Sequence, residues 1–290
     1  MKFNYLEPKT AAEAVSLLER YGGKAKVIAG GTDLVVQMRG KAARPEQVID
    51  LEYVPGLNYL KYNRRQGLRL GAMTTIRSLE TSPVVRKEYP IIAQAAGQLA
   101  SGAIRNVATL GGNLCNAAPS AEMVPSLIAL SAWAKVLGPG GERVLPLEDF
   151  FTGPGKTVLG QGELLVEVSV PPVPARTRGV YLKYSIRGSM DLAMVGVAVV
   201  MALGAGGKCR EIRIVLGAVA PTPMRAGRAE AVIRGEKINA TLIEQCANIA
   251  ADEVHPRASS FRASPEYKKE IVKVFIRRAL NLLVSDQVTS

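Results

Sequence analysis

The sequence predicts an α+β fold built in two parts, and three observations lead to this prediction. Short β-rich runs and helical patterns are interspersed up to Val170. The pair Pro171–Pro172, followed by PARTRG, is typical of a linker and predicts a boundary between the two parts. Beyond this boundary, two long β segments are followed by two helical stretches, and no internal repeat is visible.

The first predicted element is a helix that begins after Thr10, because Thr10 and Glu13 form a capping-box pattern. The glycines of Tyr21-Gly22-Gly23 are expected to end it. In the rest of the first part, the patterns predict a β-rich run over 25–34, strands within 48–54, 68–73 and 163–170, helices over 90–99 and 121–130, and a hairpin over 133–147.

The second part is predicted to contain strands over 192–203 and 211–221, which are joined by the turn GAGGK. Helices are expected over 241–251 and 266–283. The last helix has Ser264 as its N-cap residue and Pro265 at its first position, where proline is well tolerated.

Composition excludes several classes of protein. The chain has 290 residues, of which 48% are apolar, yet it has no hydrophobic run of the roughly 18 residues that a membrane span requires. The polar start also lacks the apolar core of a secretory signal. Three widely spaced cysteines can form neither a CxxC metal pair nor a fully paired disulfide framework. We therefore expect a cytoplasmic protein.

The formal net charge of +12 first suggests binding to nucleic acid. The basic residues are dispersed rather than clustered into a stripe, and only 5% of residues are aromatic, which leaves few rings for base stacking. An anionic ligand or an acidic partner surface accounts for the charge better than nucleic acid does.

Two glycine-rich segments, expected as loops, are the strongest candidates for a binding site. They are AGGT at 29–32 and TLGGN at 109–113. Glycine allows backbone N–H groups to converge on an oxyanion, and Thr32, Thr109 and Asn113 add short polar side chains. Two such loops facing each other could hold a pyrophosphate. The same pattern is also typical of plain tight turns, and the spacing alone leaves both interpretations open.

Other motifs of nucleotide sites and of catalysis fail. No GxGxxG is present, and TGPGKT at 152–157 has Phe150 where a P-loop requires glycine. His255 is the only histidine, so neither a Ser-His-Asp triad nor an HEXXH zinc site can be built. Without a nearby histidine, Cys115 is expected to be a packing residue rather than a nucleophile. We predict no catalytic residue and no metal ligand, but a protein that holds a cofactor.

Three segments carry a resemblance to a known family: AGGTDL at 29–34, IRNVATLGGNLCNAAPSAE at 104–122 and FFTGPGKTVLGQGELLVEVSVP at 150–171. They resemble the FAD-binding medium subunit of the molybdenum hydroxylases, the family of xanthine dehydrogenase and aerobic carbon monoxide dehydrogenase. The segments 183–199 and 262–280 are similar to the family's flavoprotein C-terminal domain. The resemblance therefore covers nearly the whole chain.

The resemblance implies an architecture and a site. Residues 1–175 would form a vanillyl-alcohol-oxidase (PCMH) type FAD-binding domain with subdomains of about 1–55 and 56–175, and residues 176–290 a C-terminal antiparallel sheet-and-helix domain. The residues that would bind FAD are Val27, Ile28, Ala29, Gly30, Gly31, Thr32, Asp33, Leu34, Leu99, Thr109, Leu110, Gly111, Gly112, Asn113, Glu122, Leu165, Lys183 and Tyr184.

Within this set, the resemblance gives individual roles. The two glycine segments would cradle the diphosphate, with amide and hydroxyl contacts from 30–32, and Glu122 would accept hydrogen bonds from a ribose or a neighbouring hydroxyl. Glu122 stands where the family usually has aspartate. Lys183 would lie near the isoalloxazine and tune its potential, and Tyr184 would stack on the ring or gate it. Arg187 and Asp191 either contact flavin or form a structural pair.

By resemblance, the protein is an electron-transfer subunit. It would accept electrons from two [2Fe–2S] clusters of a small partner subunit, while a large partner with the molybdenum cofactor oxidises substrate, in a dimer of heterotrimers. FAD would be noncovalent, because no histidine lies near the motifs, and no cluster-bearing cysteine insertion is present. A stand-alone flavin oxidase and a nonenzymatic nucleotide-binding module are the alternatives. The substrate and the electron acceptor cannot be deduced from the sequence.

Overall fold

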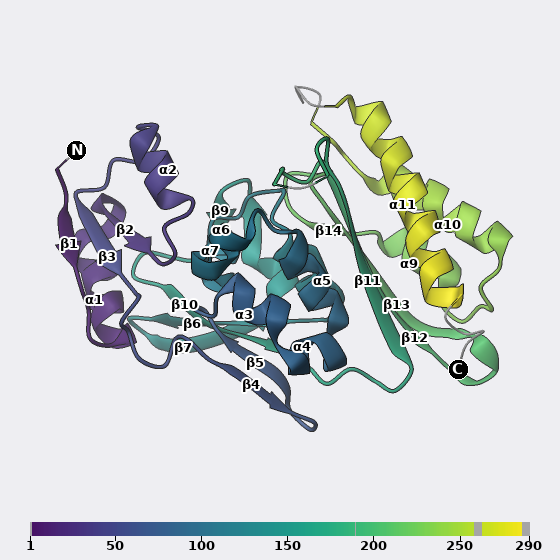
Figure 1. The fold of residues 1–290 in the computed structure, drawn as a ribbon, viewed down its shortest axis with the longest axis horizontal. Coiled ribbons are helices and arrows are strands. Elements are labelled where there is room, and N and C mark those ends of the chain that lie inside the picture. Colours follow the sequence, from purple (N-terminus) through teal and green to yellow (C-terminus); the bar gives the residue numbers. More distant parts are fainter. Residues whose placement is uncertain (1, 189, 258–262, 286–290) are drawn as a thin grey trace.

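The structure is a computed structural model that describes residues 2–188, 190–257 and 263–285. It is an elongated molecule with three sheet-based units in a row (Figure 1). The mixture of helices and mostly antiparallel strands confirms the predicted α+β class.

The N-terminal unit is a small parallel sheet in the order β1-β3-β2. Its strands are β1 (Asn4–Leu6), β2 (Ala25–Ile28) and β3 (Gln47–Asp50), and its helices are α1 (Ala11–Tyr21) and α2 (Leu34–Arg39), with a 3-10 turn, η1 (Gly22–Lys24), between α1 and β2. The Thr10 hydroxyl caps α1 by accepting the Glu13 N–H at 3.1 Å, as predicted. The Glu13 carboxylate accepts the N–H of Lys9 instead of that of Thr10, so the reciprocal half of the capping box is displaced by one residue.

The central unit is an antiparallel sheet in the order β4-β5-β10-β6-β7 with helices on one face. Its strands are β4 (Leu60–Asn63), β5 (Gly67–Gly71), β6 (Trp133–Gly138), β7 (Gly141–Pro146) and β10 (Leu164–Val170). Its helices are α3 (Ile76–Thr81), α4 (Pro83–Glu88), α5 (Pro90–Gln98), α6 (Gly102–Val107), α7 (Leu110–Cys115) and α8 (Met123–Ala129). The 3-10 helix η2 (Leu147–Phe150) leads into a small hairpin of β8 (Phe151–Gly153) and β9 (Lys156–Thr157).

The C-terminal unit is an antiparallel sheet in the order β11-β12-β13-β14. Its strands are β11 (Thr177–Tyr184), β12 (Val195–Leu203), β13 (Cys209–Gly217) and β14 (Met224–Arg225), with a 3-10 turn, η3 (Ala205–Gly207), between β12 and β13. Helices α9 (Gly227–Ile233), α10 (Ala240–Glu253) and α11 (Pro265–Ser285) cover the face that points away from the central unit (Figure 1). The predicted 192–203 and 211–221 segments are therefore strands, but each is shorter than expected.

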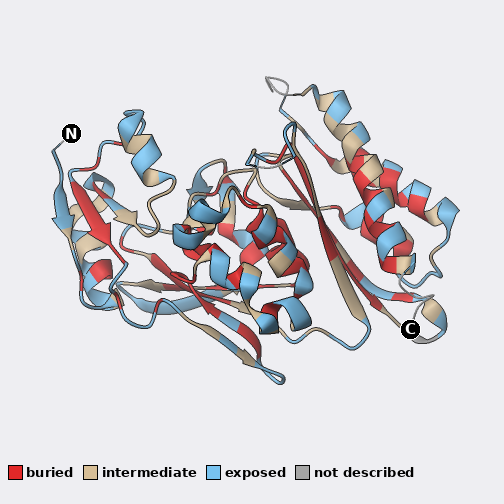
Figure 2. Cartoon of the chain, viewed as in Figure 1, coloured by how far each residue is buried: buried red, intermediate tan, exposed pale blue. Residues whose placement is uncertain are grey.

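Helices α5 and α8 hold the molecule together because they are packed from both sides. Helix α5 contacts β11, and helix α8 contacts β12 and β13 of the C-terminal sheet, while both share a core with strands β5, β6 and β10 of the central sheet. Their buried side chains, including Ile92 and Leu127, belong to a single core that extends from Leu68 in β5 to Val215 in β13 (Figure 2). Separate cores lie beneath α9–α11 and inside the N-terminal unit. In the described chain, no helix is long and apolar enough to cross a membrane.

We predict that Leu127→Ala lowers the free energy of unfolding by about 2–5 kcal/mol, since Leu127 is fully buried between two sheets and its loss leaves a cavity. Urea unfolding followed by circular dichroism measures this change. Leu282→Ala in α11 is the matched control, because Leu282 is 49% exposed and its truncation should cost no more than about 0.5 kcal/mol. Equal effects of the two substitutions would contradict the layered core.

Candidate cofactor-binding site

The main cavity, of about 690 Å³, is lined by all three units of the chain. Its walls come from the segment between β2 and α2, from α6 and α7, from the start of α8, and from the segment between β11 and β12. It is lined by most of the residues that the sequence predicted for FAD: Val27, Ala29, Gly30, Gly31, Thr32, Asp33, Leu34, Leu99, Thr109, Gly111, Gly112, Asn113, Glu122 and Leu165. The cavity therefore brings together segments that lie far apart in the sequence.

The first glycine segment is a turn whose amides face no protein acceptor. Among the described residues, the N–H groups of 30–33 donate no hydrogen bond to the protein. Gly31 has φ = +70°, which favours glycine. A Cβ on Gly30 would lie 1.9 Å from the carbonyl oxygen of Val107, so only glycine allows this turn to approach the end of α6. This arrangement suits an anion that accepts several backbone N–H groups.

The second glycine segment is a helix, so its prediction as a loop is wrong. Thr109 caps α7 by accepting the N–H of Gly112 at 3.0 Å. The N–H of Gly111 donates to the carbonyl of Ala72 at 2.7 Å, and a Cβ on Gly111 would lie 2.8 Å from that oxygen. The amides of 110–113 all have protein acceptors. The amides of 110–113 are therefore not free to hold an anion in the way that those of 30–33 are.

Asn113 is the side chain of α7 that is suited to contact with a ligand. Its Oδ1 atom is buried and has no hydrogen-bond partner, and the residue lines the cavity. A buried polar atom without a partner costs free energy unless a ligand or water satisfies it. The unpaired N–H groups of 30–33 are donors, and Asn113 provides a further polar group in the same cavity. These groups fit the diphosphate and hydroxyl chemistry of a dinucleotide.

Glu122 and Lys183 form a buried ion pair at the cavity wall. Lys183 Nζ lies 2.8 Å from Glu122 Oε1, and the side chains are 3% and 8% exposed. Nζ also donates to the carbonyl of Gln98 at 2.9 Å. Burial raises the pKa of Glu122, and the nearby Lys183 opposes part of that shift. Glu122 lines the cavity, whereas Lys183 lies behind it.

Four predicted residues do not line the cavity. Leu110 is fully buried in the central core, and Ile28 lies behind the turn, where its side chain would meet a Cβ on Gly31. Lys183 points at Glu122, as described above. Tyr184 faces the opposite side of β11, where its hydroxyl bonds to that of Tyr267 at 2.6 Å. The structure therefore brings neither Leu110 nor Tyr184 to the cavity.

Arg187 and Asp191 form the ion pair that the sequence suggested and also line the cavity. The guanidinium lies 3.6 Å from the carboxylate, and Asp191 Oδ2 accepts the N–H of Arg187 at 3.3 Å. Asp33 is a further carboxyl group on the wall, and burial raises its pKa.

The sequence analysis missed several lining residues. Gln37 of α2 donates to Asn116 Oδ1 of α7 at 3.2 Å, and both residues line the cavity. Gly155, in the segment that failed as a P-loop, also lines it, and its N–H donates to the carbonyl of Ala117 at 2.9 Å. No sequence signal marks Gln37, whereas Asn116 lies within the segment 104–122 that carries the resemblance, and the glycines of TGPGKT were a usable signal for Gly155.

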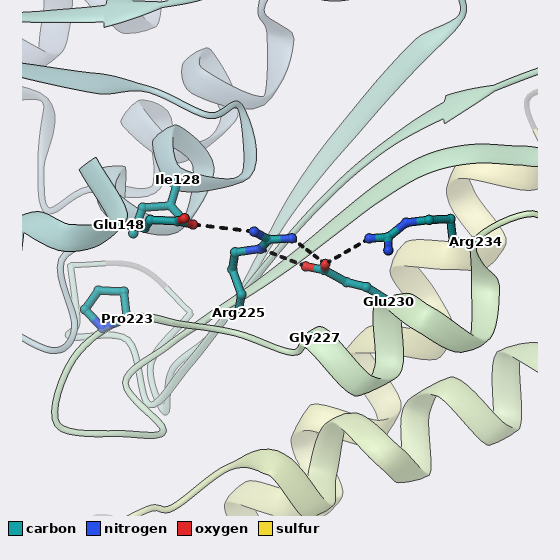
Figure 3. A pocket seen from close by; sticks show the side chains of 7 residues that line it. All are labelled: Ile128, Glu148, Pro223, Arg225, Gly227, Glu230 and Arg234. Carbon is teal, nitrogen blue, oxygen red and sulfur yellow. Dashed lines mark hydrogen bonds and ion pairs between the residues drawn. The ribbon is translucent and has the colours of Figure 1, made fainter. Parts of the chain in front are cut away.

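A second cleft, of about 550 Å³, lies where η2 meets the C-terminal unit (Figure 3). Its charged side chains pair with one another. Arg225 lies 2.6 Å from Glu230 and 3.6 Å from Glu148. Glu230 is only 1% exposed and also accepts the N–H of Ile214. Arg234 lies 3.6 Å from Glu230 on the same wall, so two carboxylates face two guanidinium groups, and the network is better suited to joining the two units than to binding a charged ligand.

The main cavity contains no acid–base pair of the kind that enzymes use. His255 is exposed and follows α10, well away from the cavity-lining segments. Cys115 lines the cavity and is exposed there, but no described side chain forms a hydrogen bond with its thiol that could activate it as a nucleophile. In the described ranges, no cluster of three or more histidine, cysteine, aspartate or glutamate side chains could hold a metal ion. Fold and cavity together define a protein that binds a nucleotide cofactor.

Comparison with known proteins identifies the family. Residues 1–173 match the family described as FAD binding domain in molybdopterin dehydrogenase, and residues 180–283 match the CO dehydrogenase flavoprotein C-terminal domain. The chain therefore belongs to the FAD-binding family of the molybdopterin dehydrogenases. It is a flavoprotein component of the oxidoreductase class, as the resemblance implied.

Individual relatives match over nearly their whole length. The chain is 32% identical to the putative xanthine dehydrogenase FAD-binding subunit XdhB of Escherichia coli K12, covering 97% of this chain and 96% of that protein. It is 34% identical to the carbon monoxide dehydrogenase medium chain of Hydrogenophaga pseudoflava, with 97% and 96% covered. A solved structure of the carbon monoxide dehydrogenase from that organism superposes with a TM-score of 0.94 at 35% identity, covering 98% of each chain.

We predict that Gly30→Ala abolishes or strongly weakens FAD binding, because the added Cβ would overlap the carbonyl of Val107 and displace the turn. The measurement is the FAD content of the purified protein, together with its melting temperature. Gly140→Ala is the matched control, since a Cβ there meets nothing within 4 Å. Normal FAD content in Gly30→Ala would show that the turn can move without losing the site.

Cys115 gives a second prediction, because its thiol is exposed to the cavity while Cys209 and Cys246 are buried. An uncharged thiol reagent should label the FAD-free protein at Cys115 alone. The rate should rise with pH, since only the thiolate reacts. Saturating FAD should slow the labelling, which mass spectrometry can follow. A rate that FAD does not change would place the cofactor elsewhere.

Proposed function

We propose that this chain is the FAD-carrying electron-transfer subunit of a multi-subunit molybdenum hydroxylase. The observation that carries the proposal is the cavity with unpaired amides at 30–33, in a chain that matches medium subunits of that family from end to end. Substrate oxidation takes place in a large partner with the molybdenum cofactor. Electrons arrive through the [2Fe–2S] clusters of a small partner and leave to an external acceptor.

When bound, FAD supplies transfer of one or two electrons, and the chain's own residues bind and orient it. The amides of 30–33 hold the diphosphate, and Thr32 and Asn113 add polar contacts on either side of it. Glu122 accepts a hydrogen bond from a hydroxyl of the cofactor. Leu99 and Leu165, both buried at the wall, exclude water from its rings. No side chain of the cavity acts as a general base.

The domains and subdomains that we propose correspond to the three units of the fold. Residues 1–175 form the FAD-binding domain, with subdomains of about 1–55 and 56–175, and residues 176–290 form the C-terminal domain. The core beneath α9–α11, which contains only residues from Val180 on, and the bounds of the two matched families support the division near residue 175. The complex is a dimer of heterotrimers in the cytoplasm. The excess of basic residues suits an acidic partner surface.

The first experiment is an absorption spectrum of the purified chain, followed by release of the chromophore with acid. We expect flavin bands, intact FAD after release and no iron–sulfur absorbance. The tagged chain, purified from its native host, should then carry two further chains in equal amounts, with molybdenum and iron measured by elemental analysis. Turnover of a substrate by the isolated chain would instead indicate a stand-alone oxidase. A chain that stays colourless in FAD would contradict the proposal.

A further inference from the structure

The buried pair of Glu122 and Lys183 differs from what the resemblance implied for a lysine at the flavin. Lys183 has two protein acceptors, the carboxylate of Glu122 at 2.8 Å and the carbonyl of Gln98 at 2.9 Å. It is 3% exposed and does not line the cavity. Glu122 stands between Lys183 and the cavity, so the wall carries a carboxylate and the cation lies behind it.

The two oxygens of Glu122 have different surroundings. Oε1 accepts from Lys183, while Oε2 accepts no hydrogen bond from another residue in the part of the chain that the structure describes. Glu122 lines the cavity, so its carboxylate lies at the wall where a bound cofactor would meet it. A carboxylate oriented by one oxygen and open at the other is a fixed hydrogen-bond acceptor.

The pair also connects the C-terminal sheet with the FAD-binding helices. Lys183 belongs to β11, whereas Glu122 directly precedes α8 and Gln98 ends α5. Burying two charges is costly unless they remain paired. The position of β11 on α5 and α8 therefore determines the charge and orientation of the group that lines the cavity.

We propose that Lys183 is a positioning residue that acts on the bound cofactor only through Glu122, and that the two side chains present a pair of zero net charge to the flavin. The proposal rests on FAD binding as proposed above. It replaces the expectation that Lys183 tunes the isoalloxazine directly as a free cation. Glu122 is the group that contacts the cofactor, and Lys183 keeps that carboxylate ionised and oriented.

The test is a double-mutant cycle of Lys183→Met, Glu122→Gln and the double variant, measured as a function of pH, because a buried carboxylate that loses its ammonium partner binds a proton more readily and its charge then depends on pH. The flavin midpoint potential is the main measurement, by titration with redox dyes. Lys183→Met leaves an unbalanced carboxylate and should lower the potential, whereas Glu122→Gln leaves an unbalanced ammonium and should raise it. The double variant should return to the potential of the unmutated protein.

FAD affinity, measured by quenching of flavin fluorescence, is the second readout. Each single substitution should weaken binding by roughly tenfold or more, and the double variant by less than the product of the two, because the side chains act as one unit. Arg69→Met is the matched control. It breaks the Arg69–Glu167 pair, which does not line the cavity, so it should lower stability but leave both readouts unchanged.

Two patterns would overturn the proposal. If Lys183→Met and the double variant lower the potential equally while Glu122→Gln has no effect, Lys183 acts on the flavin directly. If none of the variants changes the potential or the affinity, the pair is only structural. Should the single variants fail to fold, the double variant, which buries no unpaired charge, decides by its FAD affinity: weaker binding is expected if Glu122 contacts the cofactor, and unchanged binding shows that the pair is only structural. Absence of FAD binding by the unmutated chain would instead refute the proposed function.

Discussion

The close approach of one backbone segment to another determines the site of this protein. The turn at Gly30 lies against the carbonyl of Val107 at the end of α6, with no room for a Cβ between them. This contact brings the small parallel sheet against the helices of the central unit. It also turns the N–H groups of 30–33 away from the rest of the protein, so that they meet no acceptor there. The cavity lies between the units that the contact of Gly30 with Val107 brings together.

Unpaired polar groups are costly, and their grouping in one cavity indicates what the cavity is for. In contrast to the N–H groups of 30–33, every N–H of 110–113 in α7 has a protein acceptor. The buried Oδ1 of Asn113 remains without a partner on the same wall. A ligand rich in phosphate and hydroxyl oxygens satisfies such groups, and FAD is the ligand of the family to which the chain belongs.

The C-terminal sheet contributes to the site indirectly. Its strand β11 packs on α5, and α8 packs on β12 and β13, so the helices of the FAD-binding part lie between two sheets. Through Lys183, β11 also fixes Glu122 at the cavity wall. By contrast, the network of Glu148, Arg225, Glu230 and Arg234 joins the same two parts of the chain at a cleft where two carboxylates face two guanidinium groups (Figure 3). One ion pair, Glu122–Lys183, therefore lies at the wall of the cavity, whereas the ion pairs around Arg225 only join two parts of the chain.

The sequence by itself determined the order and type of the main elements, because these depend on local signals. The Thr10 cap, the glycines after Tyr21 and the hairpin at Gly138–Gly141 all act through neighbouring residues, and the structure places them as predicted. The motifs also sufficed to identify the family. Local signals could not show that Thr109–Asn113 is a capped helix, since its amides are satisfied partly by the distant carbonyls of Thr74 and Ala72.

Only the tertiary structure decided which of the candidate residues share a cavity. Neighbours on a strand point to opposite faces, so Lys183 reaches Glu122 while Tyr184 packs toward Tyr267. Gln37 and Asn116 meet across 79 positions of sequence, and no local pattern marks Gln37. The sequence alone shows which side chains the chain contains. Their partners, burial and charge balance arise when distant segments pack together.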